Sequence, residues 1–138
     1  MRILFLDLDG VTHPGPNVST SLTHFCWLPD LTRMLAPRRD IRLVIHSTWR
    51  HEYDLAELRE MLGPLSRQVL DVTEGPGRWE SIRRWLDVNR SNVQDYRVLD
   101  DEPEEFPHPA PNELIICRPD LGVTEPGVRA QLLAWLEE

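Results

Sequence analysis

Short apolar runs that end abruptly in polar residues alternate along the chain with stretches of helical periodicity. The apolar runs predict five β-strands, of which the third is the weakest: residues 2–6, 41–45, 68–72, 96–99 and 113–117. Apolar residues at helical spacing predict helices over residues 29–36, 52–62, from 78 onward and 125–136. Strands that alternate with helices indicate right-handed crossovers, and hence an α/β fold with a mainly parallel sheet covered on both faces.

Polar clusters follow three of these strands directly. Asp7-Leu8-Asp9-Gly10 ends the first strand, His46-Ser47-Thr48-Trp49-Arg50 the second, and Asp100-Asp101-Glu102 the fourth. Because the carboxyl ends of parallel strands meet at one edge of a sheet, the three clusters are expected to form a single site. Carboxylates held close together repel, so this site favours a cation, and oxygen ligands favour Mg²⁺.

The length and composition of the chain are typical of one soluble globular domain over residues 1–138. Hydrophobic residues make up 41% and charged residues 28%, and no apolar run approaches the ~20 residues that span a bilayer. The N-terminus lacks a signal-peptide pattern. Cys26 and Cys117 are too few for a disulfide framework or a zinc site, so a cytoplasmic location is expected.

The charge balance limits the classes of partner. A net charge of −8 argues against long, non-specific nucleic acid, although it leaves room for a local basic pocket. All 15 basic residues are arginine, so a catalytic cation supplied by the chain must be a guanidinium, which suits phosphate.

The clusters resemble the motifs of the haloacid dehalogenase (HAD) superfamily of phosphohydrolases. Asp7-Leu8-Asp9-Gly10-Val11 is similar to its first motif, Ser47 to the second, and Leu99-Asp100-Asp101 to the fourth. Arg78, at a helix start, fits the third motif best, with Arg83 and Arg84 as alternatives. The His46–Arg50 cluster and the Gly77–Leu86 stretch look like small capless members, some of them associated with Swiss-army-knife RNA-repair proteins. The resemblance implies a HAD-like Rossmannoid sheet in the order 3-2-1-4-5 without a cap domain.

The resemblance also implies a magnesium-dependent phosphomonoesterase. Asp7 would be the nucleophile that forms an aspartyl-phosphate, and Asp9 the general acid and base. The Asp7 carboxylate, the Asp9 backbone carbonyl, and Asp100 or Asp101 would hold Mg²⁺, while Ser47 and Arg78 would bind the phosphate. A catalytically weak phosphate-binding or regulatory module is the alternative, but binding alone would not need both Asp7 and Asp9.

Thr48 and Arg50 are two further candidates for phosphate binding, and each has a structural alternative. Thr48 can simply cap the following helix, and Arg50 can form a salt bridge. Trp49 is predicted to belong to the core, and no histidine shows metal-ligand spacing. Glu102, Glu104 and Glu105 are predicted to lie in a solvated loop.

Without a cap, substrate choice must come from loops around the site, namely the flap of residues 10–28, the His46–Arg50 cluster and the proline-rich loop of residues 102–112. Aromatic residues and arginine in these loops suit a base and its phosphate. A nucleotide or a phosphorylated nucleic-acid end is therefore favoured over a sugar phosphate or a phosphoprotein. The sequence does not predict the oligomeric state.

Overall fold

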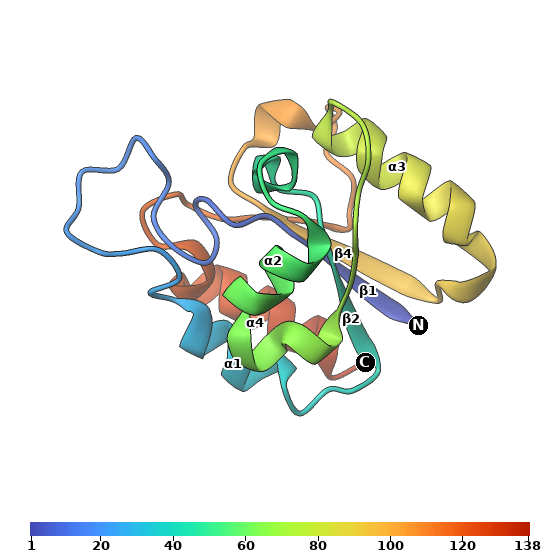
Figure 1. Cartoon of the computed structure of the whole chain (residues 1–138), viewed down its shortest axis with the longest axis horizontal. Helices are drawn as coiled ribbons and strands as arrows, with labels where there is room; N and C mark the ends of the chain where they lie inside the picture. Colours follow the sequence, from blue (N-terminus) through green and yellow to red (C-terminus); the bar gives the residue numbers. More distant parts are fainter.

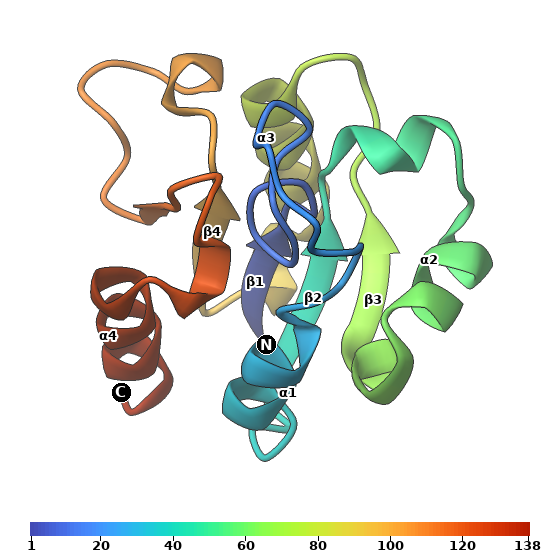
Figure 2. The same cartoon turned by 90° about the vertical axis from the view of Figure 1, so that its left-hand side faces the viewer.

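A five-stranded, all-parallel sheet forms the centre of the molecule. The computed structural model describes residues 1–138. The strands are β1 (Arg2–Leu6), β2 (Ile41–Ile45), β3 (Val69–Val72), β4 (Asp95–Asp100) and β5 (Leu114–Ile116), in the order β3-β2-β1-β4-β5. The α/β class and the predicted strand order are confirmed. Figure 2 shows the labelled strands side by side with their arrow tips at one edge of the sheet.

Four helices cover the two faces of the sheet (Figure 1). They are α1 (Leu28–Leu35), α2 (Leu55–Met61), α3 (Arg78–Asn89) and α4 (Pro126–Leu136). The larger apolar cluster joins one face of the sheet to α1, α2 and α4, and the smaller one joins the opposite face to α3. Strands that are apolar on both faces are thereby buried between helices, as parallel sheets require. No helix is both long enough and apolar enough to cross a membrane.

The helix predicted over residues 52–62 is shorter and starts later. A 3₁₀ turn over Thr48–His51 follows β2, and α2 begins only after Asp54. The Asp54 carboxylate accepts a hydrogen bond from the Glu57 backbone N–H at 2.8 Å, and the Glu57 carboxylate accepts one from the Asp54 N–H at 3.0 Å. This reciprocal cap fixes the start of α2.

The buried polar side chains all lie toward the carboxyl edge of the sheet. They follow β1, β2 and β3, open α3, or end β4, and are Asp7, Thr12, His13, His46, Ser47, Thr73, Arg78, Ser81 and Asp100. Burying polar and charged groups is costly unless they are paired, so their collection at one edge points to a functional site there.

Candidate active site

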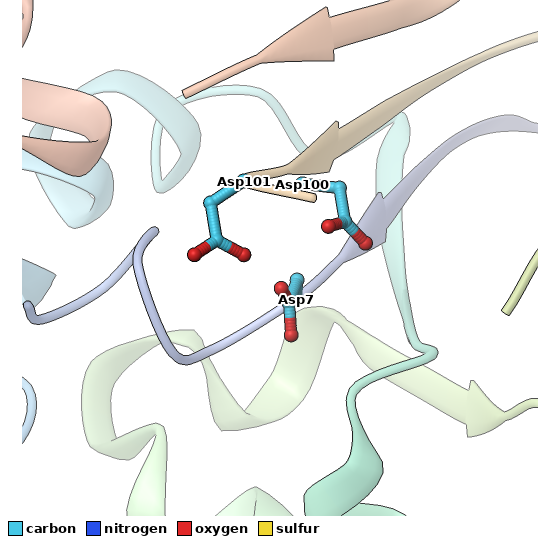
Figure 3. A group of neighbouring side chains, drawn as sticks. All are labelled: Asp7, Asp100 and Asp101. Carbon is cyan, nitrogen blue, oxygen red and sulfur yellow. The ribbon is translucent and has the colours of Figure 1, made fainter. Parts of the chain in front are cut away.

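Three carboxylates converge at the ends of β1 and β4. One oxygen atom from each of Asp7, Asp100 and Asp101 lies within 4.8 Å of the other two. Figure 3 shows the Asp7 carboxylate from the chain after β1 facing the Asp100 and Asp101 carboxylates from the end of β4. Asp7 and Asp100 are fully buried. Segments 93 residues apart in the chain (7 and 100) thus form one acidic centre, at the edge where the sequence predicted it.

Arg78 is the cation that enters this centre. It is the first residue of α3 and is 7% exposed, and its Nη1 donates to Asp7 Oδ2 and to Asp100 Oδ1, both at 2.8 Å. Burial would lower the pKa of Arg78, but the carboxylates of Asp7 and Asp100 raise it above its usual value. The Nε of Arg78 has no hydrogen-bond partner although it is buried. The guanidinium therefore keeps one donor free at the carboxylates.

The alternatives to Arg78 lie elsewhere on α3. Arg83 and Arg84 are exposed, and the Arg83 guanidinium lies 5.8 Å from the centre of the Trp79 ring. Of the loop acids predicted to be solvated, Glu104 and Glu105 are exposed, whereas Glu102 is half-buried. Glu102 and Glu105 lie 3.5 and 3.9 Å from the Arg78 guanidinium.

The acidic centre has an electrostatic cost that a bound cation would relieve. Burial, followed by the negative charge of Asp100, raises the pKa of Asp7 well above its usual range. Burial likewise raises the pKa of Asp101 to about 6. Asp100 differs: burial would raise its pKa, but a hydrogen bond and charge from His46 hold it below the usual value. Asp7 and Asp101 are thus the carboxylates whose ionised forms most need a positive charge.

Gly10 is required at the turn after β1. Its φ of +76° lies in the left-handed region, and a Cβ atom there would stand 2.1 Å from Asp101 Oδ2. Glycine thus serves both the turn and the close approach of the Asp101 carboxylate.

Asp9 lies beside the acidic centre and has partners of its own. His13 Nε2 is 2.8 Å from Asp9 Oδ1, and Trp49 Nε1–H donates to Asp9 Oδ2 at 3.1 Å. The backbone N–H of Phe25 donates to His13 Nδ1 at 3.2 Å, so Nδ1 acts as acceptor and Nε2 carries the proton toward Asp9. The hydrogen bond from His13, followed by that from Trp49, lowers the pKa of Asp9.

The segment after β2 supplies the remaining predicted residues. Ser47 is fully buried and its Oγ caps the 3₁₀ turn by accepting from the Trp49 N–H at 3.2 Å, so Ser47 fills the capping position that was the structural alternative for Thr48. Thr48 is exposed. The Arg50 guanidinium donates to the carbonyls of His46, Ser47 and Gly75, the last at 2.6 Å. Arg50 therefore links two loops and forms no salt bridge, while its buried Nε has no hydrogen-bond partner.

Three residues that hold the carboxylates in place were given no such role from the sequence. His13 and Trp49 hold Asp9, and the fully buried His46 lies 2.7 Å from Asp100 Oδ2 through its Nε2. Trp49 is half-buried among the rings of His13, His24, Phe25 and Tyr53. The available signals were the offset of four residues between Asp9 and His13, and the position of His46 and Trp49 beside Ser47 in the cluster after the second strand.

The donor set fits a hard divalent cation. All three converging groups are carboxylates, and the backbone carbonyl of Asp9 accepts no backbone hydrogen bond. Oxygen donors of this kind suit Mg²⁺, and a cation among them would offset both the burial and the repulsion from Asp100 that raise the pKa of Asp7. Ligands from histidine or cysteine are not part of the cluster.

An all-parallel sheet in the order 3-2-1-4-5, with paired acids after β1 and β4, defines a HAD-type phosphohydrolase or HAD-like module. The comparisons with known proteins agree. The family model described as "HAD domain in Swiss Army Knife RNA repair proteins" matches residues 3–128, and the chain belongs to this family. No curated protein and no solved structure matched the chain in the corresponding searches.

Proposed function

We propose that the chain is a magnesium-dependent phosphomonoesterase and that residues 1–138 form one hydrolase domain. The observation that carries the proposal is the convergence of Asp7, Asp100 and Asp101 within 4.8 Å, with Arg78 bonded to Asp7. Hydrolysis of a phosphomonoester needs a nucleophile and neutralisation of the phosphate oxygens, and this centre supplies groups for both.

The first half of the reaction forms a bond between an Asp7 carboxylate oxygen and phosphorus while the ester P–O bond breaks. Asp9 gives a proton to the leaving oxygen. Arg78 and the Ser47 hydroxyl bind the phosphate oxygens, and the free Nε of Arg78 supports this role. In the second half, water attacks the aspartyl-phosphate, Asp9 takes the proton from that water, and phosphate leaves with Asp7 restored.

Mg²⁺ would be held by the Asp7 carboxylate, the Asp9 carbonyl, and Asp100 or Asp101, and would supply positive charge to the transferring phosphoryl group. Other residues of the chain position the carboxylates that would hold it. His46 holds Asp100 in place from one side, and Arg78 does so from the other. Gly10 allows Asp101 to come close.

A panel of phosphomonoesters assayed with Mg²⁺ tests the activity. EDTA and Asp7→Asn are each expected to abolish turnover, while Asp120→Asn, which changes an exposed acid paired with Arg118, leaves the rate unchanged. Trapping the phosphorylated protein by acid quench and mass spectrometry tests the intermediate on Asp7. Turnover that survives both EDTA and Asp7→Asn would refute the assignment.

One observation favours the second candidate, a phosphate-binding module with little turnover. The hydrogen bonds from His13 and Trp49 lower the pKa of Asp9, which makes Asp9 a better base than acid. The same panel separates the two functions. Binding of a phosphate analogue such as vanadate, without turnover of any substrate in Mg²⁺, would select the module.

For the substrate we propose a nucleotide or a phosphorylated nucleic-acid end. The family description names RNA-repair proteins, and the Trp49 ring, which bonds Asp9, packs against exposed His24 and half-buried Phe25 and Tyr53. The test compares kcat/KM for a phosphorylated oligonucleotide, a mononucleotide and a sugar phosphate. Because Trp49 also bonds Asp9, His24→Ala is the better probe of stacking, and Trp49→Phe separates the ring from its N–H. Preference for the sugar phosphate, unchanged in His24→Ala, would contradict this choice.

A further inference from the structure

A second charged surface lies away from the acidic centre, on the elements that flank the start of β2 and β3. Its members are Arg39 from the turn before β2, Arg42 from β2, Arg59 from α2, and Arg67 from the 3₁₀ turn before β3. They line two shallow hollows of about 460 and about 340 Å³, which share Arg42 and Arg67. In Figure 2 the turn after α1 and the segment before β3 lie at the end of the sheet opposite the arrow tips. We call these four residues the arginine surface.

The lack of acidic partners on this surface is unusual for so acidic a chain. Eight of the 15 arginines form ion pairs, namely Arg2, Arg33, Arg38, Arg78, Arg90, Arg97, Arg118 and Arg129. The seven others form none, and four of those seven gather here. Glu60 is the one acid in the lining of the two hollows, and it pairs with none of them. Clustered like charges repel, so the arginine surface is suited to an external anion.

The arginine surface is built on elements that are held in place. Arg59 donates to the carbonyls of Val69 and Leu70, at 3.0 and 3.3 Å, which fixes its guanidinium against β3. The Gln68 amide donates to three backbone carbonyls around the turn before β2, at 3.0 to 3.2 Å. Arg42 forms no hydrogen bond through its side chain, and its Nε is buried without a partner. Cations carried on fixed elements lose little freedom when an anion binds.

We propose that the arginine surface binds the phosphate backbone of a single-stranded nucleic acid. Guanidinium groups match phosphate oxygens in pairs, and four of them along two joined shallow hollows suit successive phosphates better than one small anion. No aromatic side chain lines the hollows, so the contacts carry no base stacking and no sequence preference.

The choice of nucleic acid over an acidic peptide rests on the proposed function. A strand whose phosphorylated end occupies the acidic centre would also need its backbone held elsewhere on the molecule. Strands of five residues span about 16 Å, so a few nucleotides cover the distance from one edge of the sheet to the other. With only four cations, the contact remains short and fits the net charge of −8.

The test measures binding of a fluorescein-labelled single-stranded RNA of about 12 nucleotides without a terminal phosphate, by fluorescence anisotropy. The test variant is Arg39→Gln/Arg67→Gln, in which both residues are exposed. The control variant is Arg90→Gln/Arg118→Gln, also exposed. Each variant loses two positive charges, so both change the net charge from −8 to −10. Thermal unfolding of both variants checks that they fold.

Each lost phosphate contact reduces the salt dependence of log K by about 0.7 for a single strand. Two lost contacts therefore weaken binding about 25-fold at 0.1 M salt, and they halve a slope of about −2.8. Equal weakening in the two variants, or no binding by the wild-type chain, would overturn the proposal. So would a poly-glutamate peptide that binds as tightly as the RNA and depends equally on Arg39 and Arg67.

The result of this RNA-binding test does not depend on the result of the phosphatase test of the proposed function. The probe carries no phosphomonoester, so its binding does not depend on turnover at Asp7. RNA binding that needs the arginine surface, without any phosphatase activity, would leave this inference standing and remove the proposed function. Phosphatase activity together with RNA binding that is unchanged in Arg39→Gln/Arg67→Gln would support the proposed function and remove this inference.

Discussion

At the scale of single residues, the site depends on a few side chains that hold the acids in place. Asp9 is the clearest case, because its two oxygens have different partners, His13 at 2.8 Å and Trp49 at 3.1 Å. The backbone N–H of Phe25 sets the tautomer of His13. Asp9 is thereby held as a carboxylate, which suits its proposed role as a base toward water.

Removing the His13 hydrogen bond should raise the pKa of Asp9. We expect His13→Leu to raise it toward the usual value of an aspartate, because the hydrogen bond from His13 is the largest cause of the lowered pKa. A ¹³C NMR titration of the Asp9 carboxyl in metal-free protein measures this. His108→Leu is the control, since His108 is exposed and is not among the groups that lower the pKa of Asp9. An unchanged Asp9 pKa in His13→Leu would show that the bond does not set it.

Alanine substitutions at Gly10 and Gly63 separate the effect of backbone strain from the effect of steric crowding. Both glycines have positive φ, at +76° and +48°, but only at Gly10 would a Cβ meet a side chain, that of Asp101. We expect alanine at either position to lower the free energy of unfolding by about 1 kcal/mol. Gly10→Ala should also weaken Mg²⁺ binding roughly tenfold, as displaced ligands do. Calorimetric titration with Mg²⁺ measures the difference, and equal Mg²⁺ affinities in the two variants would contradict it.

At the scale of secondary-structure elements, the sequence predicted the strands better than the helix after β2. The apolar runs located all five strands to within two residues, because buried parallel strands are apolar on both faces. The start of α2 was wrong because helical spacing was extended back through the 3₁₀ turn at Thr48–His51. The Asp54-x-x-Glu57 capping pattern was present in the sequence and marks the true start.

The same cap gives a prediction at this scale. Asp54→Ala removes the acceptor for the Glu57 N–H, so we expect a loss of about 1 kcal/mol in the free energy of unfolding. Glu52→Ala, in the same exposed connection but without a side-chain cap, should change stability by less than about 0.5 kcal/mol. Urea unfolding compares the two. Equal losses would mean that the connection, and not the cap, stabilises α2.

The site was predictable in part for a related reason. That Asp7, Ser47 and Asp100 share one edge follows from the parallel direction of the strands that they end or follow, and the structure places them there. The partners of the acids depend on loop conformation instead. His13 reaches Asp9 through the tight turn after β1, in which the Gly10 N–H bonds the His13 carbonyl at 2.8 Å. Trp49 reaches it through the 3₁₀ turn, and hydrophobic periodicity carries no information on either turn.

At the scale of the whole molecule, charge is separated along the strands. The buried acids gather at the carboxyl edge, and the unpaired arginines of the arginine surface gather toward the other edge. The ionised carboxylates at the acidic edge destabilise the folded chain, since burial raises the pKa of both Asp7 and Asp101. Stability should therefore respond to pH and to Mg²⁺ through the same carboxylates.

The direction of this response follows from proton counting. Asp101 has a pKa of about 6 in the folded chain and about 3.9 when unfolded, so the folded chain binds more protons between these values. In EDTA, the free energy of unfolding should fall as pH rises from about 4 to 6, by roughly 1–2 kcal/mol for this partly exposed group. Asp7 contributes in the same direction, because its pKa is also raised.

Saturating Mg²⁺ should cancel this fall, because the cation stabilises the ionised carboxylates that protons otherwise neutralise. Urea unfolding at several pH values between 4.5 and 7.5, in EDTA and in Mg²⁺, is expected to show a difference that widens with pH. Asp101→Asn should flatten the dependence in EDTA and narrow the difference, whereas Asp120→Asn should leave both unchanged. If Asp101→Asn keeps the pH dependence of the wild-type chain, Asp101 is not the group that links protons and Mg²⁺ to folding.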